Sequence, residues 1–239
     1  MNFKYFLNES AKTTVQPKTK DELKKIITDT IKEQGFNCDL NFIDTSKITD
    51  MSDLFAYAKF NGDISNWNVS NVESMENMFR FSKFQGDISK WNVSNVKNMS
   101  AMFESSEFNG NISKWDVSNV KRMDFMFMYS KFNQNISKWD VSNVENMRGM
   151  FQSSKFDRDI SKWNVRNVQD MSSMFLNSEF NQDISKWNVR NVEDMRDIFR
   201  NSKFAGNISD WDVRHVKYAE DMFDNCPLEN KSEFQPEFE

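Results

Sequence analysis

Apolar and polar residues follow one another along this chain in a pattern that repeats every 24 residues. In one copy the apolar slots are Phe60, Ile64, Trp67, Val69, Val72, Met75, Met78 and Phe79. The same slots recur without insertion or deletion, and a degenerate first copy begins at Phe36. A fixed period of this length is typical of proteins in which each unit covers the apolar face of the next. The pattern predicts eight 24-residue turns, from Phe36 to about Pro227.

The spacing of apolar residues changes within each copy. The step of two from Trp67 to Val69, between polar neighbours, predicts a short strand around residues 66–70. The steps from Val72 to Phe79 predict one face of a short helix or 3₁₀ turn. We therefore expect an α/β solenoid, in which short parallel strands and short helices stack from copy to copy.

The segment before the repeats has a different pattern. Residues 1–35 form an N-terminal segment in which about residues 19–34 predict a helix with an apolar stripe. Thr19 and Glu22 have the spacing of a capping box, and Gly35 ends the helix. An end repeat exposes its apolar face, so we expect this helix to cap the array.

The repeats occupy residues 36–227, and residues 228–239 form a short acidic cap or tail. Two aromatic residues of this tail, Phe234 and Phe238, are candidates to fold back over the last repeat. No further domain is predicted within the chain.

Composition and charge exclude several classes of protein. The formal net charge of -5 and the pI near 5.2 argue against a nucleic-acid binder. The only cysteines, Cys38 and Cys226, lie near opposite ends of the array, so we expect free thiols. The chain shows no signal peptide and no apolar run long enough to span a membrane, which by itself indicates a cytoplasmic protein.

The repeat unit FNGDISNWNVSNVESMENMFRFSK resembles the BspA-like leucine-rich-repeat surface proteins, in the bacterial branch whose repeats have about this length. The likeness runs from Phe36 to about Pro227 and rests on the SNV triplet followed by a methionine pair and phenylalanine. It implies a leucine-rich-repeat-like right-handed coil. It also implies adhesion or protein binding at a bacterial surface, a location for which the chain shows no secretion signal or wall anchor.

Tryptophan and methionine recur at fixed slots. The tryptophans are Trp67, Trp91, Trp115, Trp139, Trp163, Trp187 and Trp211. We expect them in the core because Ile43 fills the slot in the first copy; the alternative is an exposed aromatic strip that stacks on sugars. The 15 methionines are expected to fill gaps in the core.

Polar slots recur as well. A ladder of asparagines is expected to satisfy backbone groups of the turns, and consists of Asn71, Asn95, Asn119, Asn143, Asn167 and Asn191. Asp or Asn precedes each isoleucine, as at Asp63 and Asn111, which fits a turn; calcium binding is the alternative. The only histidine is His215, and no glycine-rich phosphate loop is present. We therefore predict no catalytic residues, no metal site and no cofactor.

Outward-facing residues of the expected strands form the candidate binding site. It contains a lysine stripe, Lys90, Lys114, Lys138, Lys162 and Lys186, and the arginines Arg166, Arg190 and Arg214. The leading hypothesis is a non-catalytic module that binds an unidentified protein or mediates adhesion through this face. The alternatives are a carbohydrate or polyanion ligand held by the same cations, and a purely structural role. The next candidates are the positions near Arg122, Arg148 and Arg196. Oligomeric state is left open.

Overall fold

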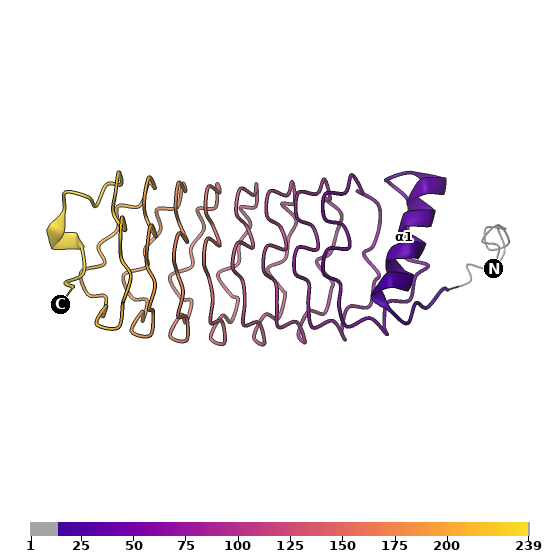
Figure 1. Cartoon of the computed structure of the whole chain (residues 1–239), viewed down its shortest axis with the longest axis horizontal. Helices are drawn as coiled ribbons and strands as arrows, with labels where there is room; N and C mark the ends of the chain where they lie inside the picture. Colours follow the sequence, from indigo (N-terminus) through magenta and orange to yellow (C-terminus); the bar gives the residue numbers. More distant parts are fainter. Residues whose placement is uncertain (1–13, 239) are drawn as a thin grey trace.

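Successive copies of the 24-residue unit lie side by side along one long axis (Figure 1). This computed structural model describes residues 14–238. Helix α1 (Lys20–Gln34) and the 3₁₀ helix η2 (Ser232–Phe234) lie at opposite ends of the array. We number the copies from repeat 1, which begins at Phe36, to repeat 8, which begins at Phe204.

The expected α/β solenoid with parallel strands is wrong. Within residues 14–238 no segment forms a strand, and the repeats contain no helix. Neighbouring repeats are joined by isolated parallel bridges, for example Ser74 with Asn98 and Asn98 with Arg122. The layers of strand and helix implied by the leucine-rich-repeat resemblance are thus missing from the described residues, and the chain is a repeat fold made mostly of turns.

Two side-chain-capped turns, one before and one at the end, bound the segment 66–70 in which we expected a strand. The Oδ1 atom of Asp63 accepts a hydrogen bond from the Ser65 N–H at 2.9 Å, and Asn68 Oδ1 accepts one from Ser70 N–H at 3.1 Å. Short polar side chains that bond the backbone two residues further on compete with extended structure. Trp67 and Val69 are nevertheless buried, so the apolar spacing of two residues correctly predicted which side chains face the core, although no strand forms.

A set of bonds between repeats replaces the expected helix. The N–H groups of Met75, Asn77, Phe79 and Phe81 donate to carbonyl groups of the next repeat at 2.8–2.9 Å. They cannot therefore donate to the residue four places earlier, as a helix requires. Asn77 and Phe81 also have positive φ angles, which interrupt a right-handed helix. We call these bonds the ladder; its N–H groups point toward the C-terminal end of the array.

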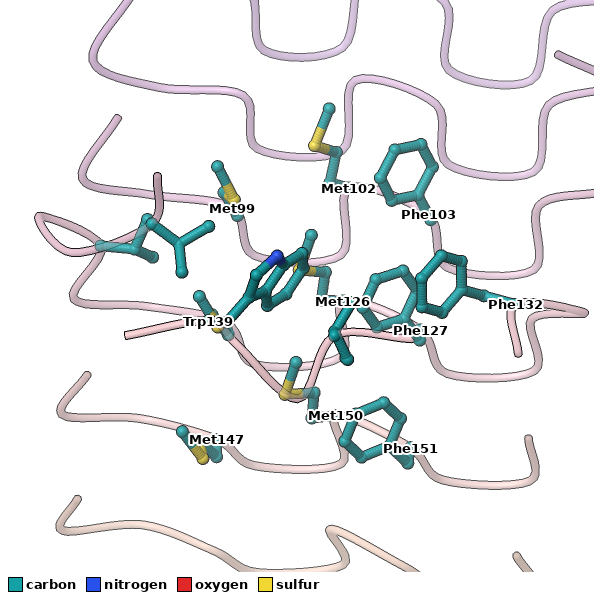
Figure 2. Packing of buried hydrophobic residues seen from close by; sticks show 14 of the residues in the cluster. Met99, Met102, Phe103, Met126, Phe127, Phe132, Trp139, Met147, Met150 and Phe151 are labelled. Carbon is teal, nitrogen blue, oxygen red and sulfur yellow. The ribbon is translucent and has the colours of Figure 1, made fainter. Parts of the chain in front are cut away.

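The core consists of stacked columns of identical side chains. Phe79, Phe103 and Phe127 stack at ring-centroid distances of 5.6 and 5.8 Å, and methionines form parallel columns beside them (Figure 2). Every tryptophan is at most 4% exposed, which confirms the core assignment and contradicts the sugar-stacking alternative. Each indole also donates to a carbonyl of the preceding repeat, as Trp139 Nε1 does to Ile112 at 3.1 Å.

The predicted N-terminal helix is confirmed. The Thr19 side chain accepts a hydrogen bond from the Glu22 N–H at 3.2 Å, and Gly35 follows the helix with φ 85°. The apolar stripe of α1, which includes Leu23 and Ile27, is buried. Residues 1–13, which carry most of the segment relevant to the signal-peptide expectation, lie outside the described residues.

The C-terminal tail folds back over part of repeat 8. The Ile208 N–H donates to the Phe234 carbonyl at 3.0 Å, and Leu228 is fully buried. Phe234 therefore covers the last repeat, as one of the two candidates predicted, whereas Phe238 is 46% exposed.

Candidate functional site

The lysine stripe lies along an edge formed by turns and not on the face of a sheet. All five lysines are exposed, at Lys90, Lys114, Lys138, Lys162 and Lys186. Lys186 Nζ lies 3.5 Å from Asp210 Oδ2. Among residues 14–238 the other four lysines form no ion pair within 4 Å, so four of the five members of the stripe are exposed cations without a close carboxylate partner.

The three arginines of the predicted site lie on the same edge, in the second turn of their repeats. Arg166 and Arg190 are exposed. Arg214 donates to both carboxylate oxygens of Asp212 at 2.8 Å, and this hydrogen bonding holds the pKa of Asp212 well below its usual range. Only two of the three arginines thus extend the basic stripe.

The stacked asparagines, a set distinct from the backbone ladder, satisfy backbone groups of the turns as predicted. Asn143 Nδ2 donates to the Ser118 carbonyl of the preceding repeat at 2.7 Å, and the other ladder asparagines make the same bond. His215 occupies this slot in repeat 8, and among the described residues no group donates to the Arg190 carbonyl that an asparagine would satisfy.

A groove of about 430 Å³ runs beside the asparagine ladder. Its lining is entirely polar, and consists of Lys121, Asn143, Glu145, Asn167, Gln169, Asn191, Glu193 and His215. Charges along it are already paired between repeats, as Lys121 Nζ lies 2.9 Å from a Glu145 oxygen. Because no aromatic residue lines it, the groove lacks the flat surface on which a sugar ring stacks.

Another exposed surface varies strongly from repeat to repeat. We call it the ladder face; it contains the exposed side chains of residues 74–81 and of the equivalent residues in the other repeats. The turn edge keeps nearly the same residues in each copy, whereas one slot of the ladder face holds residues as different as Arg80, Glu104 and Leu176. The signal in the sequence is this contrast between uniform and variable slots, and the uniform stripes alone do not reveal it.

A patch of apolar and aromatic side chains with one arginine lies at the middle of the ladder face. We call it the central patch; its main members are Phe125, Met128, Tyr129, Arg148 and Leu176, from repeats 4 to 6. Phe125, Met128 and Leu176 are half-buried, and Tyr129 is 55% exposed. Arg148 is exposed, with its guanidinium carbon 5.6 Å from the centre of the Phe125 ring.

Glycine at position 149 creates the space for the Phe125 ring. Gly149 has φ +57°, and a Cβ atom there would lie 2.6 Å from Phe125 Cδ1. The equivalent residue of repeat 3 is Ala101, which also has a positive φ. The patch is therefore a built arrangement in which a glycine, a ring and a cation from neighbouring repeats fit together.

Charged pairs flank the central patch on both sides. Toward the N-terminus, Arg80 Nε donates to Glu104 Oε2 at 2.8 Å. Toward the C-terminus, Arg196 binds Asp194, and Arg200 Nη1 lies 3.0 Å from Asp197 Oδ1. Arg122, Arg148 and Arg196 are the further candidates that the sequence suggested. Like Arg196, Arg122 pairs with a carboxylate of its own repeat, at 3.0 Å from Asp124. Arg148 alone among these arginines has a ring and no carboxylate within 4 Å in the described residues.

Groups that could hold a metal ion do not gather in the part of the chain that the structure describes. No three residues of His, Cys, Asp or Glu lie close enough there to hold a metal ion. Cys38 and Cys226 are free and buried, and burial raises the pKa of both thiols, which keeps them protonated near neutral pH. No helix within residues 14–238 is both long and apolar enough to cross a membrane.

The comparisons with known proteins agree with a repeat family. A family model described as "Mycoplasma protein of unknown function, DUF285" matches residues 22–134 and again residues 128–235. No curated protein and no solved structure matches the chain. Because the two matches together cover α1 and nearly all of the repeats, this chain belongs to the DUF285 family of Mycoplasma proteins.

Proposed function

We propose that this protein is a non-catalytic module that binds another protein through the central patch. The supporting observation is the patch itself: Phe125, Met128 and Tyr129 beside Arg148, in the middle of the variable face. Protein interfaces are enriched in aromatic residues, methionine and arginine at their centre, and the rim around them is polar. The ion pairs on both sides of the patch correspond to such a rim.

Adhesion at a bacterial surface is the setting that we propose for this binding. It is supported by the resemblance of the repeat to the BspA-like surface proteins. The DUF285 match is compatible with it and names no activity.

The alternative is a polyanion or an acidic glycan bound to the lysine stripe. It is favoured by the row of unpaired cations from Lys90 to Lys162, together with Arg166 and Arg190. Like charges in neighbouring repeats repel one another, and an anion that lies between them relieves this repulsion. Binding of this kind weakens steeply as salt rises.

Two matched variants separate the proposals. The patch variant carries Tyr129→Ser, Arg148→Ser and Leu176→Ser. The stripe variant carries glutamine at Lys138, Lys162, Lys186, Arg166 and Arg190. Both leave the buried core slots unchanged, so both are expected to fold, which circular dichroism checks.

Each variant and the native protein are then used to capture partners from the source cells at low and at high salt. We expect the native protein and the stripe variant to capture the same protein at both salt concentrations, and the patch variant to lose it. Loss of capture with the stripe variant alone, combined with strong salt dependence, would instead support the polyanion.

A further inference from the structure

Repeat 8 ends the ladder with N–H groups that have no acceptor among residues 14–238. One repeat earlier, the N–H groups of Met195, Asp197 and Phe199 donate to carbonyls of repeat 8 at 2.8, 3.0 and 3.1 Å. The equivalent residues of repeat 8 are Ala219, Asp221 and Phe223. Among residues 14–238 no acceptor lies within hydrogen-bonding distance of these three N–H groups. The edge therefore presents a row of three donors in the register of the interior ladder.

The C-terminal tail closes only part of this end. The fourth donor in the row, the Asn225 N–H, lies 3.2 Å from Glu229 Oε2 and is thus satisfied. On the other side of repeat 8 Ile208, whose N–H donates to the Phe234 carbonyl of the tail, is fully buried, and Trp211 is buried as well.

Apolar side chains along the donor row are also partly exposed. Val216, Ala219 and Phe223 are half-buried. Their equivalents one repeat earlier are fully buried, at Val192, Met195 and Phe199. The interior repeats show what covers such residues: the backbone of a further segment that accepts the ladder bonds.

Charge around the donor row restricts what binds there. Glu220 and Asp224 are exposed, and within the described residues neither forms an ion pair within 4 Å. Asp221 forms an ion pair with Arg200, whose Nη1 lies 3.2 Å from Asp221 Oδ2. These exposed carboxylates disfavour an anionic ligand, so neutral acceptors such as peptide carbonyls, with basic side chains beside them, are favoured.

We propose that residues 217–225 form an edge that binds an extended peptide segment bearing lysine or arginine. Main-chain carbonyls of the peptide accept hydrogen bonds from Ala219, Asp221 and Phe223, and its cations face Glu220 and Asp224. Addition of a segment to an exposed backbone edge is a recurring mode of peptide recognition, in which main-chain bonds supply affinity and side chains supply selectivity. This surface is separate from the central patch, and its binding does not depend on that function.

A second copy of the chain is a less suitable occupant. Its repeat 1 would have to supply the carbonyls, and α1 lies against that end of the array (Figure 1). Lys20 Nζ, at the start of α1, is bound to Asp50 at 3.1 Å in the first ladder segment.

The test uses a blocked peptide with the sequence of residues 121–130, KRMDFMFMYS, which is a ladder segment with a basic start. It is titrated into the full-length ¹⁵N-labelled protein while the amide signals of Ala219, Asp221 and Phe223 are followed. Met195 and Phe199 serve as interior references. The enantiomeric peptide of D-amino acids has the same charge and composition and controls for electrostatic attraction alone.

We expect saturable shifts of the repeat 8 amides with the L-peptide and none with the D-peptide. E220K with D224K should weaken binding at least tenfold. E73K with E76K makes the same charge change at exposed residues of repeat 2 and should leave binding within twofold. Absence of saturable shifts at millimolar peptide, equal shifts with the D-peptide, or equal weakening by both variants would overturn the proposal. Concentration-dependent dimers in sedimentation that protect the same amides would do so too, because a second copy would then be the occupant.

Discussion

The guanidinium of Arg148 lies over the ring of Phe125, at 5.6 Å from carbon to ring centre. The two residues come from neighbouring repeats, and the contact is a cation–π interaction worth about 0.5–1 kcal/mol at an exposed site. A Cβ atom at position 149 would lie only 2.6 Å from Phe125 Cδ1, too close for any residue but glycine unless the ring moves. The geometry of the central patch therefore depends on Gly149.

Gly149→Ala is expected to displace Phe125 and to destabilise the protein by about 1–2 kcal/mol. Alanine is strained in the left-handed backbone conformation of this position, and its Cβ would clash with the Phe125 ring. Partner capture should fall as well. Ala101→Gly, at the equivalent position of repeat 3, is the matched control and should change stability by less than about 0.5 kcal/mol. Urea unfolding measures both, and an unchanged midpoint for Gly149→Ala contradicts the packing described.

Trp139→Phe should destabilise the protein by about 2–4 kcal/mol. The substitution leaves a gap in the core and removes the donor to the buried Ile112 carbonyl. Denaturant unfolding followed by circular dichroism checks this result. The control is Tyr129→Phe at an exposed position, for which we expect less than about 0.5 kcal/mol. A cost for Trp139→Phe as small as that of the control would show that the indole bond contributes little.

His215→Asn is expected to stabilise repeat 8 by about 0.5–1 kcal/mol, the usual net value of one added hydrogen bond. The new amide would donate to the Arg190 carbonyl, as Asn191 Nδ2 donates to the Arg166 carbonyl at 2.7 Å. Asn143→Ala removes the same bond from an interior repeat and should have the opposite sign. Thermal unfolding of both variants tests the pair of predictions, which fails if the two shifts have the same direction.

Acid should weaken the turns that contain aspartate. Hydrogen bonds from the serine two residues further on lower the pKa of four carboxyl groups, Asp63, Asp87, Asp159 and Asp183. Because the folded pKa lies below the unfolded value near 3.9, this stabilisation is complete above that pH. It is lost as the pH falls through the folded pKa.

Replacing these four aspartates by asparagine should keep stability at pH 7 nearly unchanged and flatten its dependence on pH between about 2 and 4. Asparagine already performs this role in repeat 4, where Asn111 Oδ1 accepts from the Ser113 N–H at 3.0 Å. Unfolding midpoints measured across this pH range are the test. A variant as acid-sensitive as the native protein would mean that other carboxylates dominate.

The stripe variant, with glutamine at the three lysines and two arginines, should be slightly more stable than the native protein at low salt. Its substitutions remove repulsion between exposed like charges along the turn edge. The difference should vanish in about 1 M salt, where the screening length is about 3 Å. Melting temperatures at both salt concentrations check this, and a less stable variant at low salt would contradict it.

Local pattern was sufficient to predict much of this protein. The 24-residue period places the core slots, and burial confirms them for Trp139 and the phenylalanine columns. The capping-box spacing predicted α1, because Thr19 and Glu22 lie only three residues apart in the sequence. The turn role of Asn143 could also be predicted, since a polar residue at a corner has few other partners.

Tertiary structure decided how the backbone bonds and where the candidate site lies. The N–H of Met75 donates to a carbonyl 23 residues further on, so no local spacing shows that the ladder replaces strand and helix. Phe125, Arg148 and Leu176 belong to three repeats, and only their stacking makes them one surface. The sequence alone thus determines which side chains are buried, because burial follows the period. Bonds and surfaces formed between repeats depend on the register in which the repeats stack.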